Sequence, residues 1–178
     1  MNNYKKLLFF LEEEERNFQH LIRAMQALSE YFPLDDTFFS KLTDEQIDIL
    51  DRFIFRFTKT VDSIGKRLFP ELLNVLGERD EDMFFRDMLN RLEKIGILNR
   101  VEDWNSYRER RNSLTHEYPE PDSAKTAMLL DAYEKSFELI TLFERIKTLL
   151  AQKTDIVMAA YSPPDVSTLP HATMSEKM

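Results

Sequence analysis

Four side chains suited to chemistry fall within eight residues of the chain: Arg111, Asn112, His116 and Tyr118. An imidazole can move protons near neutral pH, and a guanidinium is a fixed cation for a phosphate. Asn112 and His116 are four residues apart, so on a helix they share a face and can form a hydrogen bond that orients the imidazole. A histidine near a helix C-terminus can also serve only to compensate the helix dipole, and that alternative stays open.

Arg111 lies in the middle of an otherwise apolar stripe. At about 100° per residue, one arc of a helix contains Trp104, Tyr107, Arg111, Leu114 and Tyr118. A buried cation without a partner costs several kcal/mol, so this guanidinium needs a carboxylate, backbone carbonyls or a ligand phosphate. An ordinary internal salt bridge is the simpler alternative.

Arg111 and His116 are about 140° apart on a regular helix. Both can reach one phosphate only if the helix end unwinds, which Pro119 favours at Tyr118, or if a second chain contributes. The aromatic stripe is also hard to bury fully within one small bundle. For both reasons we expect a homodimer.

A further set of basic residues is predicted to contact an RNA backbone. Three of them recur at helical spacing on the expected second helix, where Lys66 continues the stripe, and one precedes Arg111; they are Arg52, Arg56, Lys59 and Arg108. The alternative is a solvated helix face whose cations pair with acidic neighbours such as Asp48, Asp51 and Asp62. The formal net charge of −8 argues against a broad basic surface, so any RNA contact must be local.

Most other chemistries lack their usual residues. The chain has no cysteine, and its three histidines, His20, His116 and His171, show no metal-ligand spacing. It also lacks the glycine-rich phosphate loops and the serine elbow of nucleotide and ester hydrolases. We therefore expect no metal and no cofactor.

The elements that must position these residues are helices. Only 3 glycines and 7 prolines interrupt the chain, and apolar residues recur at helical spacing. The expected helices cover about 4–31, 43–76, 81–95, 101–116 and 122–150. Their boundaries follow from a capping box at Thr43, an Asp122-Ser123 cap and terminal glycines at Gly77 and Gly96. Gly65 and Pro70 are expected to kink or split the second helix.

The expected fold is all-α, an antiparallel up-down bundle of four to five helices that covers residues 1–152. Residues 153–178 are expected to form a flexible tail with almost no apolar surface to bury. The acidic run 12–15 is expected on the solvated side of the first helix. The apolar run near the N-terminus is too short for a secretory or membrane-spanning segment, and with no cysteine present we expect a cytoplasmic protein without membrane contact.

The motif formed by Arg111, His116 and Tyr118 resembles the R-x4-H-x-Y signature of HEPN domains. It is most similar to HepT-like toxins and the nucleotidyltransferase substrate-binding proteins. The aromatic-rich stretch 52–61 resembles the second helix of that family, and the resemblance covers roughly residues 49–118 well. It reinforces the expected HEPN-like bundle.

The resemblance implies a toxin of a toxin–antitoxin pair, a metal-independent endoribonuclease that acts as a homodimer. Arg111 and His116 would be catalytic and Asn112 would orient the imidazole. A small nucleotidyltransferase antitoxin would attach AMP to Tyr118. The alternative is a non-catalytic partner that docks on a nucleotidyltransferase and uses the same motif to bind nucleotide or to present Tyr118.

Overall fold

The computed structural model describes residues 2–80, 82–115, 121–154 and 165–172, and these residues form helices and no β-strand. The helices are α1 (Asn3–Ser29), α2 (Asp44–Ser63), α3 (Phe69–Val75), α4 (Phe85–Lys94), α5 (Val101–Thr115) and α6 (Asp122–Lys153). A short 3₁₀ helix, η1 (Phe38–Lys41), precedes α2, and a π-helical turn, η2 (Ile64–Leu68), joins α2 to α3 without a break. The expected all-α fold is confirmed.

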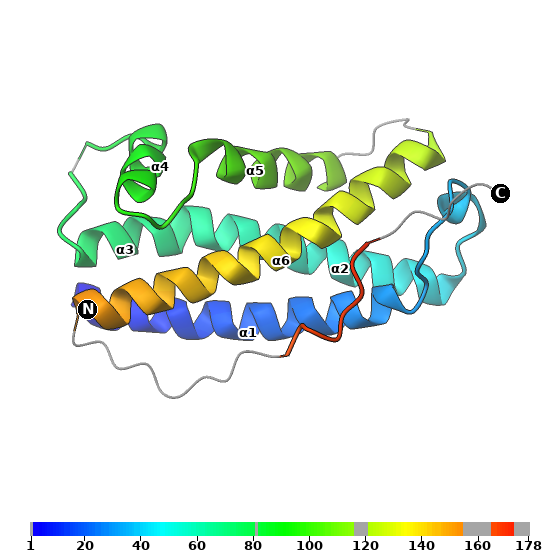
Figure 1. The fold of residues 1–178 in the computed structure, drawn as a ribbon, viewed down its shortest axis with the longest axis horizontal. Coiled ribbons are helices and arrows are strands. Elements are labelled where there is room, and N and C mark those ends of the chain that lie inside the picture. Colours follow the sequence, from blue (N-terminus) through cyan, green and yellow to red (C-terminus); the bar gives the residue numbers. More distant parts are fainter. Residues whose placement is uncertain (1, 81, 116–120, 155–164, 173–178) are drawn as a thin grey trace.

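The long helices run alternately up and down the molecule (Figure 1). In this view the chain runs from left to right through α1, returns through α2 and α3, runs to the right again through α5 and returns through α6, while the short α4 stands at the left end. This is the antiparallel up-down arrangement that short connections between amphipathic helices favour. No helix in the described ranges is long and apolar enough to cross a membrane.

Local sequence signals account for most helix boundaries. Thr43 and Gln46 form the expected capping box, in which the Gln46 amide donates to Thr43 Oγ1 and the Thr43 amide donates to Gln46 Oε1. Gly77 and Gly96 adopt positive φ after α3 and α4, as expected for helix C-terminal glycines. The expected cap at Asp122 is wrong by one position, because α6 begins at Asp122 with Pro121 as its N-cap and without a side-chain cap hydrogen bond.

Gly65 shapes the middle of the second helical rod differently from expectation. The rod neither breaks nor splits there, and instead widens into the π-helical turn. A Cβ atom on Gly65 would lie 2.8 Å from Cζ2 of Trp104, a fully buried residue of α5. The glycine therefore allows α5 to pack closely against α2, beside Asp62.

Part of the C-terminal segment packs on α6. The Leu169 side chain is only 9% exposed and belongs to the core. The Ala172 amide donates to Glu134 Oε1 at 2.5 Å, and the His171 ring lies 5.2 Å from that of Phe137. The expectation that residues 153–178 bury almost no apolar surface is wrong for residues 165–172, because Leu169 joins the core and Val166 and Ala172 pack against it.

Candidate functional site

Arg111 lies near the C-terminal end of α5 and is held by a carboxylate of α2. Its Nη2 donates to Oδ2 of Asp62, and its Nη1 donates to Oδ1 of Asn112 at 2.8 Å. The Arg111 side chain stays 26% exposed and that of Asp62 stays 32% exposed. The internal salt bridge is thus the partner that the structure supplies, while solvent still reaches the guanidinium.

The rest of the predicted motif is only partly described. The Asn112 side chain accepts a hydrogen bond from Arg111 and so helps to orient the guanidinium. His116 and Tyr118 lie outside the described residues, and so does the expected contact between Asn112 and His116. The last described turn before them is held by Thr115, whose hydroxyl donates to the carbonyl oxygens of Arg111 and Asn112. Side-chain bonds of this kind are common where helices bend or end.

Basic side chains surround the Asp62 carboxylate. Lys66 Nζ lies 3.4 Å from Asp62 Oδ2. A cavity of about 230 Å³ between α2 and α5 is lined by Asp62, Lys66 and Arg108, with Trp104 at its wall. The Arg108 guanidinium lies 5.0 Å from the ring centroid of Phe85, on α4. Arg108 therefore lines the same cavity as Asp62, the partner of Arg111.

The remaining predicted phosphate contacts are distributed along α2. Lys59 lines a groove on the outer face of α2 together with Asp62. Arg56 lies over the ring of Phe55, 5.2 Å from its centroid, and Arg52 is exposed near the middle of the helix. Within the described ranges, no ion pair joins these three basic residues to Asp48 or Asp51, so the predicted pairing with acidic neighbours holds only for Lys66.

The aromatic stripe of α5 is buried within the single chain. Trp104 is 0% exposed and Tyr107 is 5% exposed. The Tyr107 hydroxyl donates to Glu138 Oε2 on α6 at 2.9 Å, and burial together with that carboxylate raises the pKa of Tyr107 well above its usual value. The argument that this stripe needs a second chain to cover it is therefore wrong for Trp104 and Tyr107.

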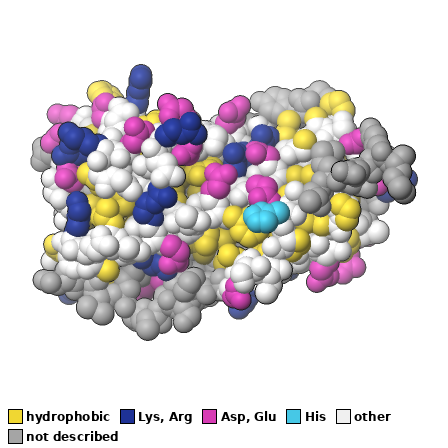
Figure 2. Space-filling view, viewed as in Figure 1, with side chains coloured by type: hydrophobic (Ala, Val, Ile, Leu, Met, Phe, Trp, Pro, Cys, Tyr) yellow, Lys and Arg dark blue, Asp and Glu magenta, His cyan; other side chains and the backbone are white. Residues whose placement is uncertain are grey.

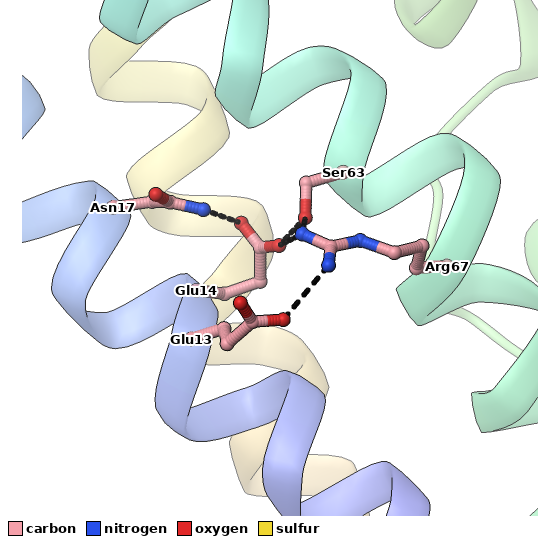
Figure 3. Close-up of polar contacts among 5 residues, drawn as sticks. All are labelled: Glu13, Glu14, Asn17, Ser63 and Arg67. Atoms are coloured by element: carbon pink, nitrogen blue, oxygen red, sulfur yellow. Dashed lines mark hydrogen bonds and ion pairs between the residues drawn. The ribbon is translucent and has the colours of Figure 1, made fainter.

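A buried polar cluster between α1 and α2 was not expected (Figure 3). Glu14 is 1% exposed and accepts hydrogen bonds from Ser63 and from Asn17, the latter at 3.3 Å. Arg67 Nη2 donates to Ser63 Oγ at 2.6 Å, while its Nη1 lies 2.8 Å from Glu13 Oε2. The prediction that the whole run 12–15 faces solvent is wrong for Glu14.

Burial dominates the electrostatics of Glu14. Desolvation raises the pKa of its carboxyl from 4.5 to about 7, although the hydrogen bond from Asn17 and the positive charge of Arg67 oppose that rise. The spacing of the first helix contained the signal. Buried apolar residues occur at Leu7, Leu11, Phe18, Leu21, Met25 and Leu28, alternating four and three residues apart, and Glu14 occupies the position between Leu11 and Phe18.

Charge of both signs is mixed on the molecular surface. On the face that Figure 2 shows, Lys and Arg side chains lie interspersed with Asp and Glu. Among the residues with a described position, no group of three histidine or acidic side chains is arranged to hold a metal ion. No family model matches the chain, and neither a curated protein nor a solved structure matches it.

Proposed function

We propose that this chain is a HEPN-type, metal-independent endoribonuclease whose site is Arg111, Asn112 and His116. The observation that carries the proposal is the position of Arg111. It stands partly exposed near the C-terminal end of a helix, five residues before His116 in the chain, and both a carboxylate and an amide hold its guanidinium. That arrangement supports a fixed cation beside a proton-transfer group.

In the proposed reaction the 2′-oxygen of a ribose attacks the neighbouring phosphorus and the 5′-oxygen leaves. His116 accepts the proton from the 2′-hydroxyl, a 2′,3′-cyclic phosphate forms, and the leaving 5′-oxygen takes up a proton from water. Arg111 stabilises the negative charge that develops on the phosphorane oxygens. Asn112 positions the guanidinium. Arg108 and Lys66, which line the cavity at Asp62, would bind neighbouring phosphates.

The same proposal includes regulation of the site by modification of Tyr118. Tyr118 follows His116 by two residues, so an AMP group attached to its hydroxyl by a small nucleotidyltransferase antitoxin would bring a phosphate to this basic site. The modified protein would then exclude RNA by electrostatic and steric competition. A homodimer belongs to this proposal through the family resemblance, and the cytoplasm is the compartment in which it would act.

The test is cleavage of a labelled RNA by the purified chain in excess chelator. Arg111→Ala and His116→Ala should each reduce cleavage by a factor on the order of 10² to 10⁴. Circular dichroism should show an unchanged helical fold. Tyr118→Phe should cleave normally but resist modification by a nucleotidyltransferase partner.

Arg110→Ala is the matched control, because the adjacent Arg110 pairs with Asp131 of α6 at 2.6 Å and should affect only packing. Its cleavage should stay close to wild type. If the folded wild-type chain cuts no RNA, and His116→Ala behaves like wild type in cells, the ribonuclease proposal is wrong.

One observation favours a second proposal, the non-catalytic partner of a nucleotidyltransferase. Asp62 already neutralises Arg111, and a carboxylate next to the guanidinium weakens its attraction for a substrate phosphate. Such a partner would bind a nucleotidyltransferase and present Tyr118 without cutting RNA. A stable complex with that enzyme, which persists in Arg111→Ala and His116→Ala, would favour this proposal.

A further inference from the structure

A groove of about 390 Å³ lies on the outer face of α2 and the π-helical turn. Its lining residues recur once per turn of the rod and include Phe55, Thr58, Lys59, Asp62, Lys66 and Arg67. Asp62, the partner of Arg111, stands near its middle, so the groove borders the candidate site. A strand bound in it would pass beside Arg111.

Positive charge extends from the groove to α1. Desolvation lowers the pKa of the exposed His20 imidazole on α1, and the positive charges of Arg56, Arg23 and Lys59 lower it further. The three cations thus lie close enough to His20 to disfavour its protonated form. In a chain with a net charge of −8, such a basic area is a local exception.

The carboxylates of this region are already engaged. Asp62 is bound by Arg111 and Lys66, and Glu13 is bound by Arg67. Lys66 keeps a side chain that is 70% exposed, despite its 3.4 Å contact with Asp62. The groove therefore offers cations to an anionic ligand without a free acidic side chain among its described lining residues.

Phe55 supplies a second kind of contact. It is 56% exposed at one end of the groove, one turn from Lys59. An exposed aromatic ring beside lysines is the combination with which proteins bind single-stranded nucleic acids, since the ring stacks on a base while the lysines contact phosphates. Lys59 and Lys66 are seven residues apart, roughly 10 Å along the rod, so they can contact different phosphates of one strand.

We propose that this groove binds single-stranded RNA, with a base stacked on Phe55 and phosphates held by Lys59 and Lys66. The inference rests on the proposed function for the identity of the nucleic acid, and it adds the path by which the strand reaches Arg111. Charge complementarity argues for this occupant. An acidic protein segment would use the lysines but would gain little from Phe55.

The experiment measures binding of a fluorescein-labelled oligouridine to the full chain by anisotropy, with His116→Ala in every variant to prevent cleavage. The double variant Lys59→Ala, Lys66→Ala should bind at least tenfold more weakly. Its slope of log affinity against log salt should fall by about 1.4, at about 0.7 for each lost contact with a single strand. Phe55→Ala should weaken binding roughly tenfold and leave the slope unchanged, because stacking releases no counterion.

Matched controls come from α4 and its N-cap. Lys94→Ala removes an exposed lysine, and Phe84→Ala removes a ring that is 78% exposed. Both should bind like the parent. Unchanged affinity in the groove variants, equal losses in the controls, or the absence of any binding would overturn the proposal. Competition by polyglutamate as effective as that by unlabelled oligouridine would also overturn it, in favour of an acidic polypeptide.

The groove and the proposed function can fail separately. If the wild-type chain cleaves RNA but the groove variants bind normally, the groove proposal is wrong and the ribonuclease proposal stands. If the wild-type chain cleaves nothing while binding depends on Phe55, Lys59 and Lys66, the ribonuclease proposal is wrong and the groove is supported.

Discussion

Asp62 and Glu14 each lie within ion-pair distance of an arginine, but Asp62 is partly exposed and Glu14 is buried. Asp62 is 32% exposed, and a partly exposed ion pair is worth on the order of 0 to 1 kcal/mol. Arg111 can therefore exchange Asp62 for a phosphate at little cost. Glu14 is buried, so its protonation, more than its 4.0 Å approach to Arg67, determines its contribution to stability.

Replacing Glu14 with Gln should remove most of a pH dependence of stability between about pH 4.5 and 7. The folded-state pKa is raised, so the folded protein holds a proton here that the unfolded chain releases. Stability therefore falls as the pH rises through this range. At 1.36 kcal/mol per pKa unit, the fall amounts to roughly 3 kcal/mol. Urea unfolding at several pH values measures it.

Glu12→Gln is the control for that experiment, because Glu12 is an exposed carboxylate of the same helix. It should leave the pH dependence of the wild type intact. Parallel stability curves for wild type and Glu14→Gln would show that the pKa of Glu14 is the same in the folded and unfolded states.

At the scale of helices, the sequence predicts the features that depend on neighbouring residues, such as helix caps and ends. The Thr43 capping box and the glycines at 77 and 96 lie where expected, because each depends on a few neighbouring residues. The burial of Glu14 and the π-helical turn at Gly65 depend on α2 and α5, which are distant in sequence. The sequence predicts that Arg111 binds a carboxylate, backbone carbonyls or a phosphate. Which of these it binds depends on the packing of α5 against α2, which brings Asp62 to the guanidinium.

Gly65→Ala should destabilise the protein although alanine favours helix more than glycine does. The added Cβ would lie 2.8 Å from Trp104 Cζ2, so the indole or the rod must move. Overpacking of this kind costs about 1–3 kcal/mol, more than the ~1 kcal/mol that alanine gains in a helix. Thermal unfolding followed by circular dichroism should show a lower Tm.

Trp104→Phe provides the companion experiment, since the smaller ring removes the clashing atom. In that background Gly65→Ala should cost markedly less, which a double-mutant cycle would record as coupling. A Gly65→Ala protein as stable as wild type would show that α5 adjusts its position freely.

Across the whole molecule, the net charge is negative, whereas the charge around the groove on α2 is positive. The chain is acidic overall, yet Arg56 and Lys59 of α2 lie near His20 of α1, and Lys66 of η2 pairs with Asp62 at the Arg111 site. If the groove binds RNA as proposed, the acidic charge elsewhere should disfavour nonspecific binding to nucleic acids.

The C-terminal segment is the part whose contribution to the whole fold can be measured most directly. Deletion of residues 165–178 should lower stability by about 1–2 kcal/mol, or ~2–8 °C in Tm, because it exposes the surface that Leu169 covers. Leu169→Ser in the full chain should reproduce most of that loss, and Thr168→Ala, at an exposed neighbour, should not. Differential scanning calorimetry distinguishes these variants. A deletion variant that melts with wild type would mean that the buried leucine only offsets the conformational entropy lost when the segment orders.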